Sequence, residues 1–287
     1  MTNNRFGPSR REMRILQMGE NILRKFRMKW DEYRLQFNRD KSHHLHQKLG
    51  SRYGGWYVPA NLLDAQSICY CIGAGEDVSF DIELINKFRC HVYTFDPTPR
   101  AQRHVEGLRQ SIQVRKVHTV EYSPSESYRC DSITLANLHF FPYGIWREGG
   151  VMRFYVPRDS AHVSHSLVNL QGTTDYFEAE CRTLKTVMQE LKHDALTLLK
   201  LDVEGAEYGI LDSMLADNIF PRIICVEFDE GRNAKDKDYR RRIQEVINKL
   251  KRVGYLATFF DGWNVTFVAE HRSNTPHAEP SVIAAGK

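Results

Sequence analysis

The stretch SICYCIGAGEDVSFDIELINKF, residues 67–88, decides the fold because its character changes twice. The first six residues form an apolar run with the length of a buried strand, and a GAG loop follows. Phe80, Leu84 and Phe88 then recur at helical spacing. Strand, glycine loop and helix in this order predict the first unit of an α/β sheet.

The same alternation continues along the chain. Apolar runs predict strands at residues 91–95, 134–141, 150–156, 195–201 and 222–228, helices at about 97–110, 205–216 and 235–253, and a closing strand pair at 255–260 and 264–270. This pattern predicts a mostly parallel sheet with helices on both faces. Ligands bind such sheets at the carboxyl ends of the strands. The segments that follow predicted strands, residues 73–77, Asp96 and residues 202–207, should therefore meet in one cleft.

Composition predicts a soluble globular protein. The chain has 287 residues, of which 41% are hydrophobic, and it contains neither a run of about 20 apolar residues nor the apolar core of a signal peptide. The cytoplasm is the location that these features favour. The six cysteines are scattered without zinc-ligand spacing, which predicts reduced thiols.

The first 50 residues form a basic arm. They hold 12 Lys and Arg against 5 Asp and Glu, and this surplus of 7 exceeds the net charge of +4 of the whole chain. An apolar stripe at helical spacing predicts an amphipathic helix; its residues are Ile15, Met18, Ile22, Phe26, Trp30, Tyr33 and Phe37. We interpret the basic residues as a solvated helix face, and the stripe as a surface that packs on the core or on a second copy of the chain in a homo-oligomer. Residues 51–272 would form the catalytic domain and residues 273–287 a loose tail.

The glycine loop carries a chemical signal. Gly73 and Gly75 allow close approach of a ligand, but Val78 replaces the third glycine of a dinucleotide site. Glu76 and Asp77 would repel a pyrophosphate and favour a ligand with positive charge. Asp96 is placed to accept the hydroxyls of a ribose, with a helix N-cap as the alternative. A ribose ligand that carries a cation and no pyrophosphate indicates S-adenosylmethionine.

The chain also resembles the FkbM family of S-adenosylmethionine-dependent methyltransferases over about residues 53–270. The blocks that carry the resemblance are YGGW, GAGEDVSFD, FDPTP, FPYGIW, VSHS, DYFEAE, LKLDVEGAEY and VEFDE, in this order. The resemblance implies a Rossmann-like class I fold of seven strands that ends in an antiparallel hairpin. It also implies O-methylation of carbohydrates or natural products, and it places Gly144, Ile145 and Trp146 near the adenine.

Three carboxylates, Asp202, Glu204 and Glu207, follow the predicted strand 195–201. Transfer of a methyl group to a hydroxyl requires removal of a proton, which calls for a general base or a metal ion. Clustered carboxylates also repel one another unless a cation lies among them. That cation could be a divalent metal, a substrate amine, the sulfonium, or a neighbouring Arg or Lys. The alternative for the two glutamates is a structural role at a helix N-terminus.

Three further residues complete the predicted site. His165, in the VSHS block, is the histidine candidate for an assisting base because an imidazole titrates near neutrality. Glu227 and Asp229 follow the predicted strand 222–228 and would face the acceptor, or else bind loop amides.

We weigh three other functions against this one. A nicotinamide-dependent oxidoreductase conflicts with the missing third glycine. An inactive cofactor-binding protein conflicts with the intact carboxylates. Methylation of nucleic acid, guided by the basic arm, lacks an NPPY-type motif and a recognisable RNA-binding motif. The acceptor that we expect is a small molecule.

Overall fold

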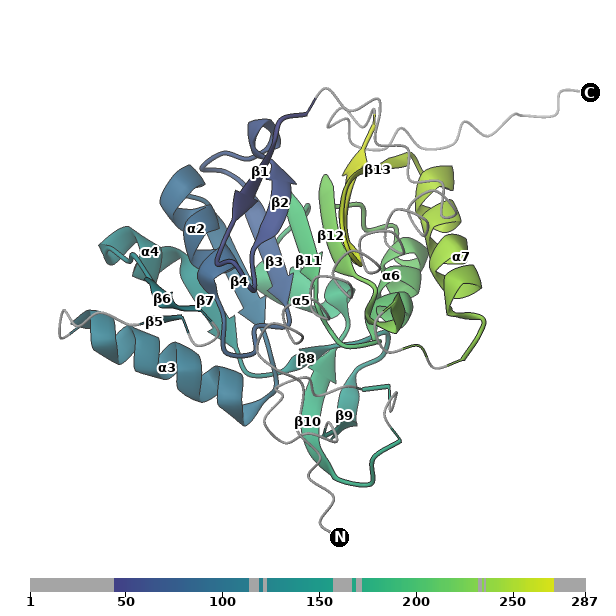
Figure 1. The fold of residues 1–287 in the computed structure, drawn as a ribbon, viewed down its shortest axis with the longest axis horizontal. Coiled ribbons are helices and arrows are strands. Elements are labelled where there is room, and N and C mark those ends of the chain that lie inside the picture. The colour runs from purple at the N-terminus through teal and green to yellow at the C-terminus, as the bar shows by residue number, and fades with distance from the viewer. Residues whose placement is uncertain are drawn as a thin grey trace, which may run out of the picture.

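The computed structural model describes residues 44–113, 119–120, 123–156, 167–168, 172–231, 234 and 236–270. A seven-stranded sheet with the order β13-β14-β12-β11-β3-β4-β7 forms its centre (Figure 1). Its strands are β3 (Ile68–Ile72), β4 (His91–Phe95), β7 (Leu138–Phe141), β11 (Leu198–Leu201), β12 (Ile223–Glu227), β13 (Tyr255–Asp261) and β14 (Asn264–Ala269). The five strands from β7 to β12 are parallel, and β14 pairs antiparallel with both β12 and β13. The predicted terminal hairpin is confirmed.

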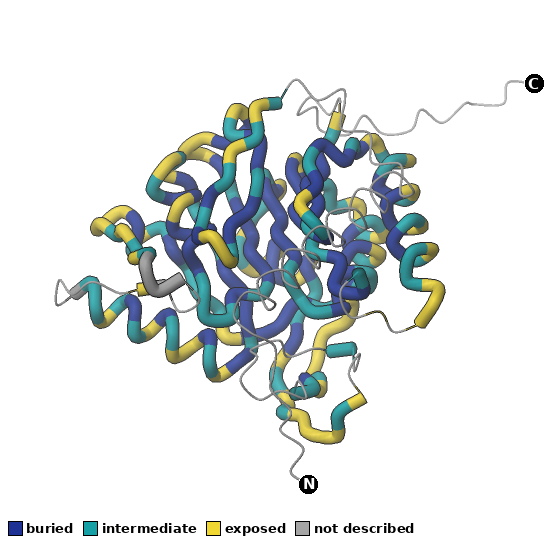
Figure 2. Tube along the Cα trace, in the orientation of Figure 1, coloured by how far each residue is buried: buried dark blue, intermediate teal, exposed yellow. Residues whose placement is uncertain are grey.

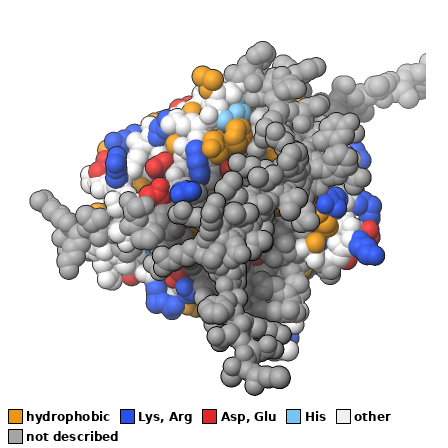
Figure 3. All heavy atoms as spheres, in the orientation of Figure 1, with side chains coloured by type: hydrophobic (Ala, Val, Ile, Leu, Met, Phe, Trp, Pro, Cys, Tyr) orange, Lys and Arg blue, Asp and Glu red, His pale blue; other side chains and the backbone are white. Residues whose placement is uncertain are grey.

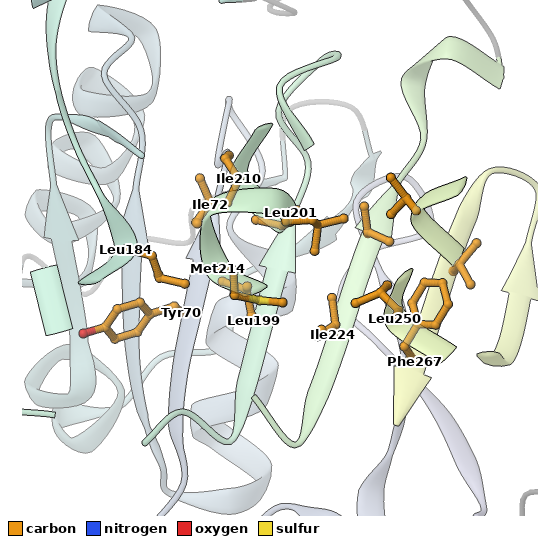
Figure 4. Packing of buried hydrophobic residues seen from close by; sticks show 14 of the residues in the cluster. Tyr70, Ile72, Leu184, Leu199, Leu201, Ile210, Met214, Ile224, Leu250 and Phe267 are labelled. Carbon is orange, nitrogen blue, oxygen red and sulfur yellow. The ribbon is translucent and has the colours of Figure 1, made fainter. Parts of the chain in front are cut away.

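Helices cover both faces of this sheet. They are α2 (Ser79–Phe88), α3 (Pro99–Gln113), α4 (Ser132–Asn137), α5 (Leu184–Leu191), α6 (Glu207–Ala216) and α7 (Tyr239–Arg252). Alternate strand residues enter different cores: Cys69 and Cys71 pack with α2 and α3, whereas Tyr70 and Ile72 pack with α5 and α6. Figure 4 shows part of the core between the sheet and the helices α5 and α6. Figure 2 shows the buried strands between partly exposed helices. The apolar runs that form β3, β11 and β12 are thus strands buried on both faces.

A small second sheet lies below the carboxyl ends of β3 and β4 in Figure 1. It has the order β8-β10-β9 and consists of β8 (Gly144–Ile145), β9 (Gly150–Tyr155) and β10 (Tyr176–Arg182). The strand predicted at residues 150–156 belongs to this sheet and not to the central one. Because β8 follows directly after β7, this sheet lies at the edge where ligands bind.

One predicted strand begins too early. Residues 134–137 form the end of α4, and only residues 138–141 form β7. A capping box begins this helix: Asp131 Oδ1 accepts from the Thr134 backbone N–H at 2.8 Å, and Thr134 Oγ1 accepts from the Asp131 N–H at 3.1 Å. The cap outweighs the β propensity of this segment.

The domain begins before the predicted boundary at residue 51. Strand β1 (His46–Leu49) pairs antiparallel with β2 (Trp56–Pro59), so residues 46–49 belong to the globular part. The remaining short elements are β5 (Thr119–Val120), β6 (Ser123–Ser127) and the 3₁₀ helices η2 (Ala60–Leu62) and η3 (Asp229–Gly231). The predicted N-terminal helix and the tail from residue 273 lie outside the described residues.

Two general expectations can be compared with the structure. All six cysteines are free thiols, as predicted. None of the helices in the described ranges is long and apolar enough to span a membrane. Basic side chains of α7 form ion pairs: Arg241 pairs with Glu245, and Lys249 pairs with Asp212 of α6. Figure 3 shows groups of Lys and Arg side chains with a few Asp and Glu on the visible face.

Candidate active site

A cavity of about 920 Å³, which includes space open to solvent, lies at the carboxyl ends of β3, β4 and β11. The cavity brings together most of the predicted residues: Gly73, Gly75, Glu76, Asp77, Asp96, Gly144, Ile145, Asp202 and Glu204. The topology accounts for this convergence, because parallel strands end at the same edge of the sheet.

Asp96 organises the glycine loop. Its Oδ2 accepts from the backbone N–H groups of Ala74 and Gly75, both at 2.8 Å. Its Oδ1 accepts from the Thr98 backbone N–H at 2.8 Å and from the Thr98 hydroxyl at 2.6 Å. A carboxylate has about four acceptor sites, so the protein itself already occupies those of Asp96. This carboxylate therefore has a structural role first, and a contact to a ribose stays a prediction.

Gly73 is a position that only glycine suits. Its φ is +85°, and a Cβ there would overlap the carbonyl oxygen of Asp202. We expect Gly73→Ala to lower the free energy of unfolding by about 2 to 3 kcal/mol, from left-handed strain and overpacking. Gly149→Ala is the matched control, because its nearest neighbour would be the Cys181 carbonyl oxygen at 3.7 Å. Urea unfolding of both variants measures the difference, and equal losses would contradict the prediction.

Two acidic residues beside the loop already have protein partners. Glu76 forms a bidentate ion pair with Arg100, at 3.1 and 2.7 Å. Asp77 accepts from the Ser51 hydroxyl at 2.6 Å and from the Ser79 N–H at 2.9 Å. Ser51 in turn accepts from the backbone of residues 53 and 54. Through this chain of bonds, Asp77 holds the YGGW segment against the mouth of the cavity.

The cation that the carboxylate cluster requires is Lys200, which the sequence analysis did not single out. Lys200 lies in β11, is 4% exposed and lines the cavity. Its Nζ lies 3.2 Å from Asp202 Oδ2 and donates to the Gly73 carbonyl at 2.5 Å. Burial alone would lower the pKa of Lys200, but Asp202 and Asp81 outweigh burial and raise it above the ordinary value. A lysine inside the run LLKL was the available signal, because buried lysines are rare without partners.

The three predicted carboxylates do not occupy equivalent places. Asp202 and Glu204 line the cavity, and Glu204 adopts a left-handed φ of 51°. That conformation is uncommon for a residue other than glycine and is a feature of functional loops. Glu207, at the start of α6, is fully buried outside the cavity lining, where its Oε2 accepts from the Gly205 N–H at 2.8 Å. The geometry favours a structural role for Glu207, which supports the loop that carries Glu204.

The position of Glu207 leads to a pH prediction. Burial, with a smaller contribution from Asp229, raises the pKa of Glu207 to about 8. The unfolded chain releases this proton at the ordinary glutamate pKa of 4.5, so stability falls as pH rises through the window from about 4.5 to 8. When pH rises from 5.5 to 8.5, the free energy of unfolding of wild type should therefore fall by about 3 kcal/mol relative to that of Glu207→Gln. Each pKa unit corresponds to about 1.36 kcal/mol. Urea unfolding at both pH values measures this, with exposed Glu178→Gln as control; parallel stability curves for Glu207→Gln and wild type would refute it.

The other predicted residues lie elsewhere. Trp146 is not in the cavity lining. It packs against Gly209, where an added Cβ would lie 2.7 Å from the Trp146 ring. Glu227 and Asp229 also lie outside the lining, at the end of β12 and in η3. His165 falls outside the described residues, and its assisting role stays a prediction. Conversely, Phe154 of β9, together with Leu167, lines the cavity without having been predicted.

The described residues contain no group of three or more His, Cys, Asp or Glu side chains placed to hold a metal ion. The sequence suggested a ligand set of three carboxylates, Asp202, Glu204 and Glu207. Only the first two line the cavity, because Glu207 is buried in the core. These residues do not fit a metal site.

Comparisons with known proteins agree with the resemblance seen in the sequence. Residues 68–257 match the family model described as "Methyltransferase FkbM domain". No curated protein matches the chain.

Similar solved structures include FkbM methyltransferase from Methylobacillus flagellatus KT, with 12% identity and a TM-score of 0.40, covering 72% of this chain and 44% of that one. They also include an rRNA methylase from Streptococcus thermophilus, with 10% identity and a TM-score of 0.36, covering 74% and 92%. The fibrillarin pre-rRNA processing protein of Methanococcus jannaschii has 11% identity and a TM-score of 0.37, covering 80% and 84%.

The chain spans less than half the length of the first of these proteins. The family match covers well over half of the 287 residues and contains the glycine loop, Asp96 and the carboxylates of the cavity. The chain belongs to the FkbM family of methyltransferases.

Proposed function

We propose that this cavity binds S-adenosylmethionine and that the protein transfers the methyl group to a hydroxyl of a carbohydrate or natural-product-type small molecule. One observation carries the proposal: the lining holds five carboxylates, those of Glu76, Asp77, Asp96, Asp202 and Glu204, around a glycine loop. Arg100 pairs with Glu76 and Lys200 pairs with Asp202, but acidic side chains remain in excess in the described lining, which disfavours a dinucleotide pyrophosphate and favours a cationic ligand. When bound, the cofactor supplies a methyl group on a sulfonium.

Apolar residues on one side of the cavity suit a planar base. Gly144 and Ile145 of β8 and Phe154 of β9 lie together there, and a Cβ at Gly144 would come within 2.9 Å of the Phe154 ring. We assign this wall to the adenine. The glycine loop, turned by Asp96, would support the methionine part of the cofactor.

Asp202 is the residue that we assign to the acceptor hydroxyl. Its Oδ2 lies toward Lys200, its side chain is 31% exposed, and it lines the cavity. A carboxylate in this position can accept the hydroxyl proton as the methyl group is transferred. Glu204, two residues further on, would orient the acceptor. The collinear arrangement of nucleophile, methyl and sulfur then depends on the fixed loops of this edge.

Calorimetric titration with S-adenosylhomocysteine, and separately with NADH, tests the cofactor assignment. We expect micromolar binding of S-adenosylhomocysteine and no binding of NADH. Binding of NADH, or of neither ligand, would overturn the proposal. A panel of sugars, glycosylated natural products and RNA, assayed for release of S-adenosylhomocysteine, tests the acceptor class. Turnover with RNA alone would contradict the small-molecule assignment.

A further inference from the structure

Among the described residues, Lys200 has two partners for its three N–H groups. An ammonium has three donors, and within the described part of the chain the Nζ of Lys200 contacts the Gly73 carbonyl and Asp202 Oδ2. The side chain is almost completely buried, yet it lines the cavity. A buried charged donor with spare capacity at a cavity wall indicates a ligand group of opposite charge.

The charge distribution of the cavity makes this donor distinctive. Lys200 is the sole basic side chain among the described lining residues, and the five carboxylates surround the rest of the loop. Asp81 of α2, which is 2% exposed, is a second acidic neighbour of Lys200. These neighbours keep Lys200 protonated. An anionic ligand group thus has one favourable place in the cavity, at the base of the glycine loop beside Gly73.

We propose that Lys200 binds the α-carboxylate of the methionine part of the cofactor, an inference that rests on the proposed function. That end of S-adenosylmethionine is a zwitterion. Its ammonium suits the acidic lining, whereas its carboxylate would be repelled by every charged side chain of the described lining except Lys200. Lys200 would then make the protein select the intact cofactor over an analogue without the carboxylate.

The test compares two ligands on two proteins by calorimetry: S-adenosylhomocysteine and its decarboxylated analogue, on wild type and Lys200→Met. Wild type should bind S-adenosylhomocysteine at least about tenfold more tightly, which corresponds to about 1.4 kcal/mol. Lys200→Met should bind both ligands with affinities within about threefold of each other. Lys185→Met, an exposed lysine on α5, should keep the wild-type preference.

The ratio of the two ligand affinities shows whether the proposed function or the role of Lys200 is wrong. If wild type binds neither ligand, the proposed function fails. If wild type binds both equally, or if Lys200→Met keeps the preference, the inference about Lys200 fails while the cofactor assignment stands. If Lys200→Met bound both ligands as wild type does but transferred the methyl group more slowly, Lys200 would act on the acceptor. That result would also overturn the inference.

Loss of Lys200 also leaves Asp81 and Asp202 without their cation. Should Lys200→Met fail to fold, the double variant Lys200→Met/Asp81→Asn removes one charge of each sign. The same comparison of ligands on that variant then gives the answer, with loss of the preference as the expected result and its retention as the contrary one.

Discussion

Asp96→Ala should unfold with a free energy about 3 to 5 kcal/mol lower than wild type, and should bind S-adenosylhomocysteine at least about 100-fold more weakly. The carboxylate is 4% exposed and accepts four hydrogen bonds, two from the glycine loop and two from Thr98. Alanine would leave three backbone N–H groups without this acceptor. Each unsatisfied buried donor costs about 1 to 3 kcal/mol.

Asp131→Ala is the matched control for this variant. Asp131 also accepts hydrogen bonds from a backbone N–H and a threonine hydroxyl, but its side chain is 48% exposed. Water can replace these bonds, so we expect a much smaller loss of stability and unchanged ligand binding. Urea unfolding and calorimetry measure both quantities. If Asp96→Ala kept its affinity, the loop would not depend on this carboxylate, and Asp96 would not organise the site.

The sequence predicted the central sheet well because its strands are buried on both faces. Such strands are short apolar runs, and the helices between them show one apolar stripe. Residues 134–137 were assigned wrongly because the competing signal, the capping box of Asp131 and Thr134, depends on two side chains and not on periodicity. Strand β10 was missed although its residues alternate between more and less exposed positions, as expected for a strand with one solvated face.

The site was predictable where position follows from topology. Gly73, Asp96 and Asp202 each follow a parallel strand and therefore meet at one edge of the sheet. Side-chain direction was harder to predict. Glu207 lies on α6, and which way it faces depends on where the first turn of that helix begins, a detail that spacing alone does not fix. Phe154 comes from a separate sheet, and no local pattern indicates that β9 lies beside the cavity.

Asp202→Asn should reduce methyl transfer by a factor of about 100 to 10,000, the usual contribution of a general base. Asparagine has the same shape, and its carbonyl oxygen can still accept from Lys200, so the loop should keep its geometry. The amide cannot take up the proton of the acceptor hydroxyl. We therefore expect kcat to fall much more than the affinity for S-adenosylhomocysteine, which should change by less than about threefold.

A matched substitution separates this role from a general effect of charge. Asp212, on α6, is 51% exposed and accepts from Lys249 at 2.6 Å, outside the cavity lining. Asp212→Asn removes the same charge and should leave kcat unchanged, when measured with an acceptor that wild type methylates. If Asp202→Asn instead weakened cofactor binding strongly and left kcat intact at saturation, Asp202 would bind the cofactor ammonium. The acceptor proton would then go to another group of the site, and the assignment of Asp202 as the base would fall.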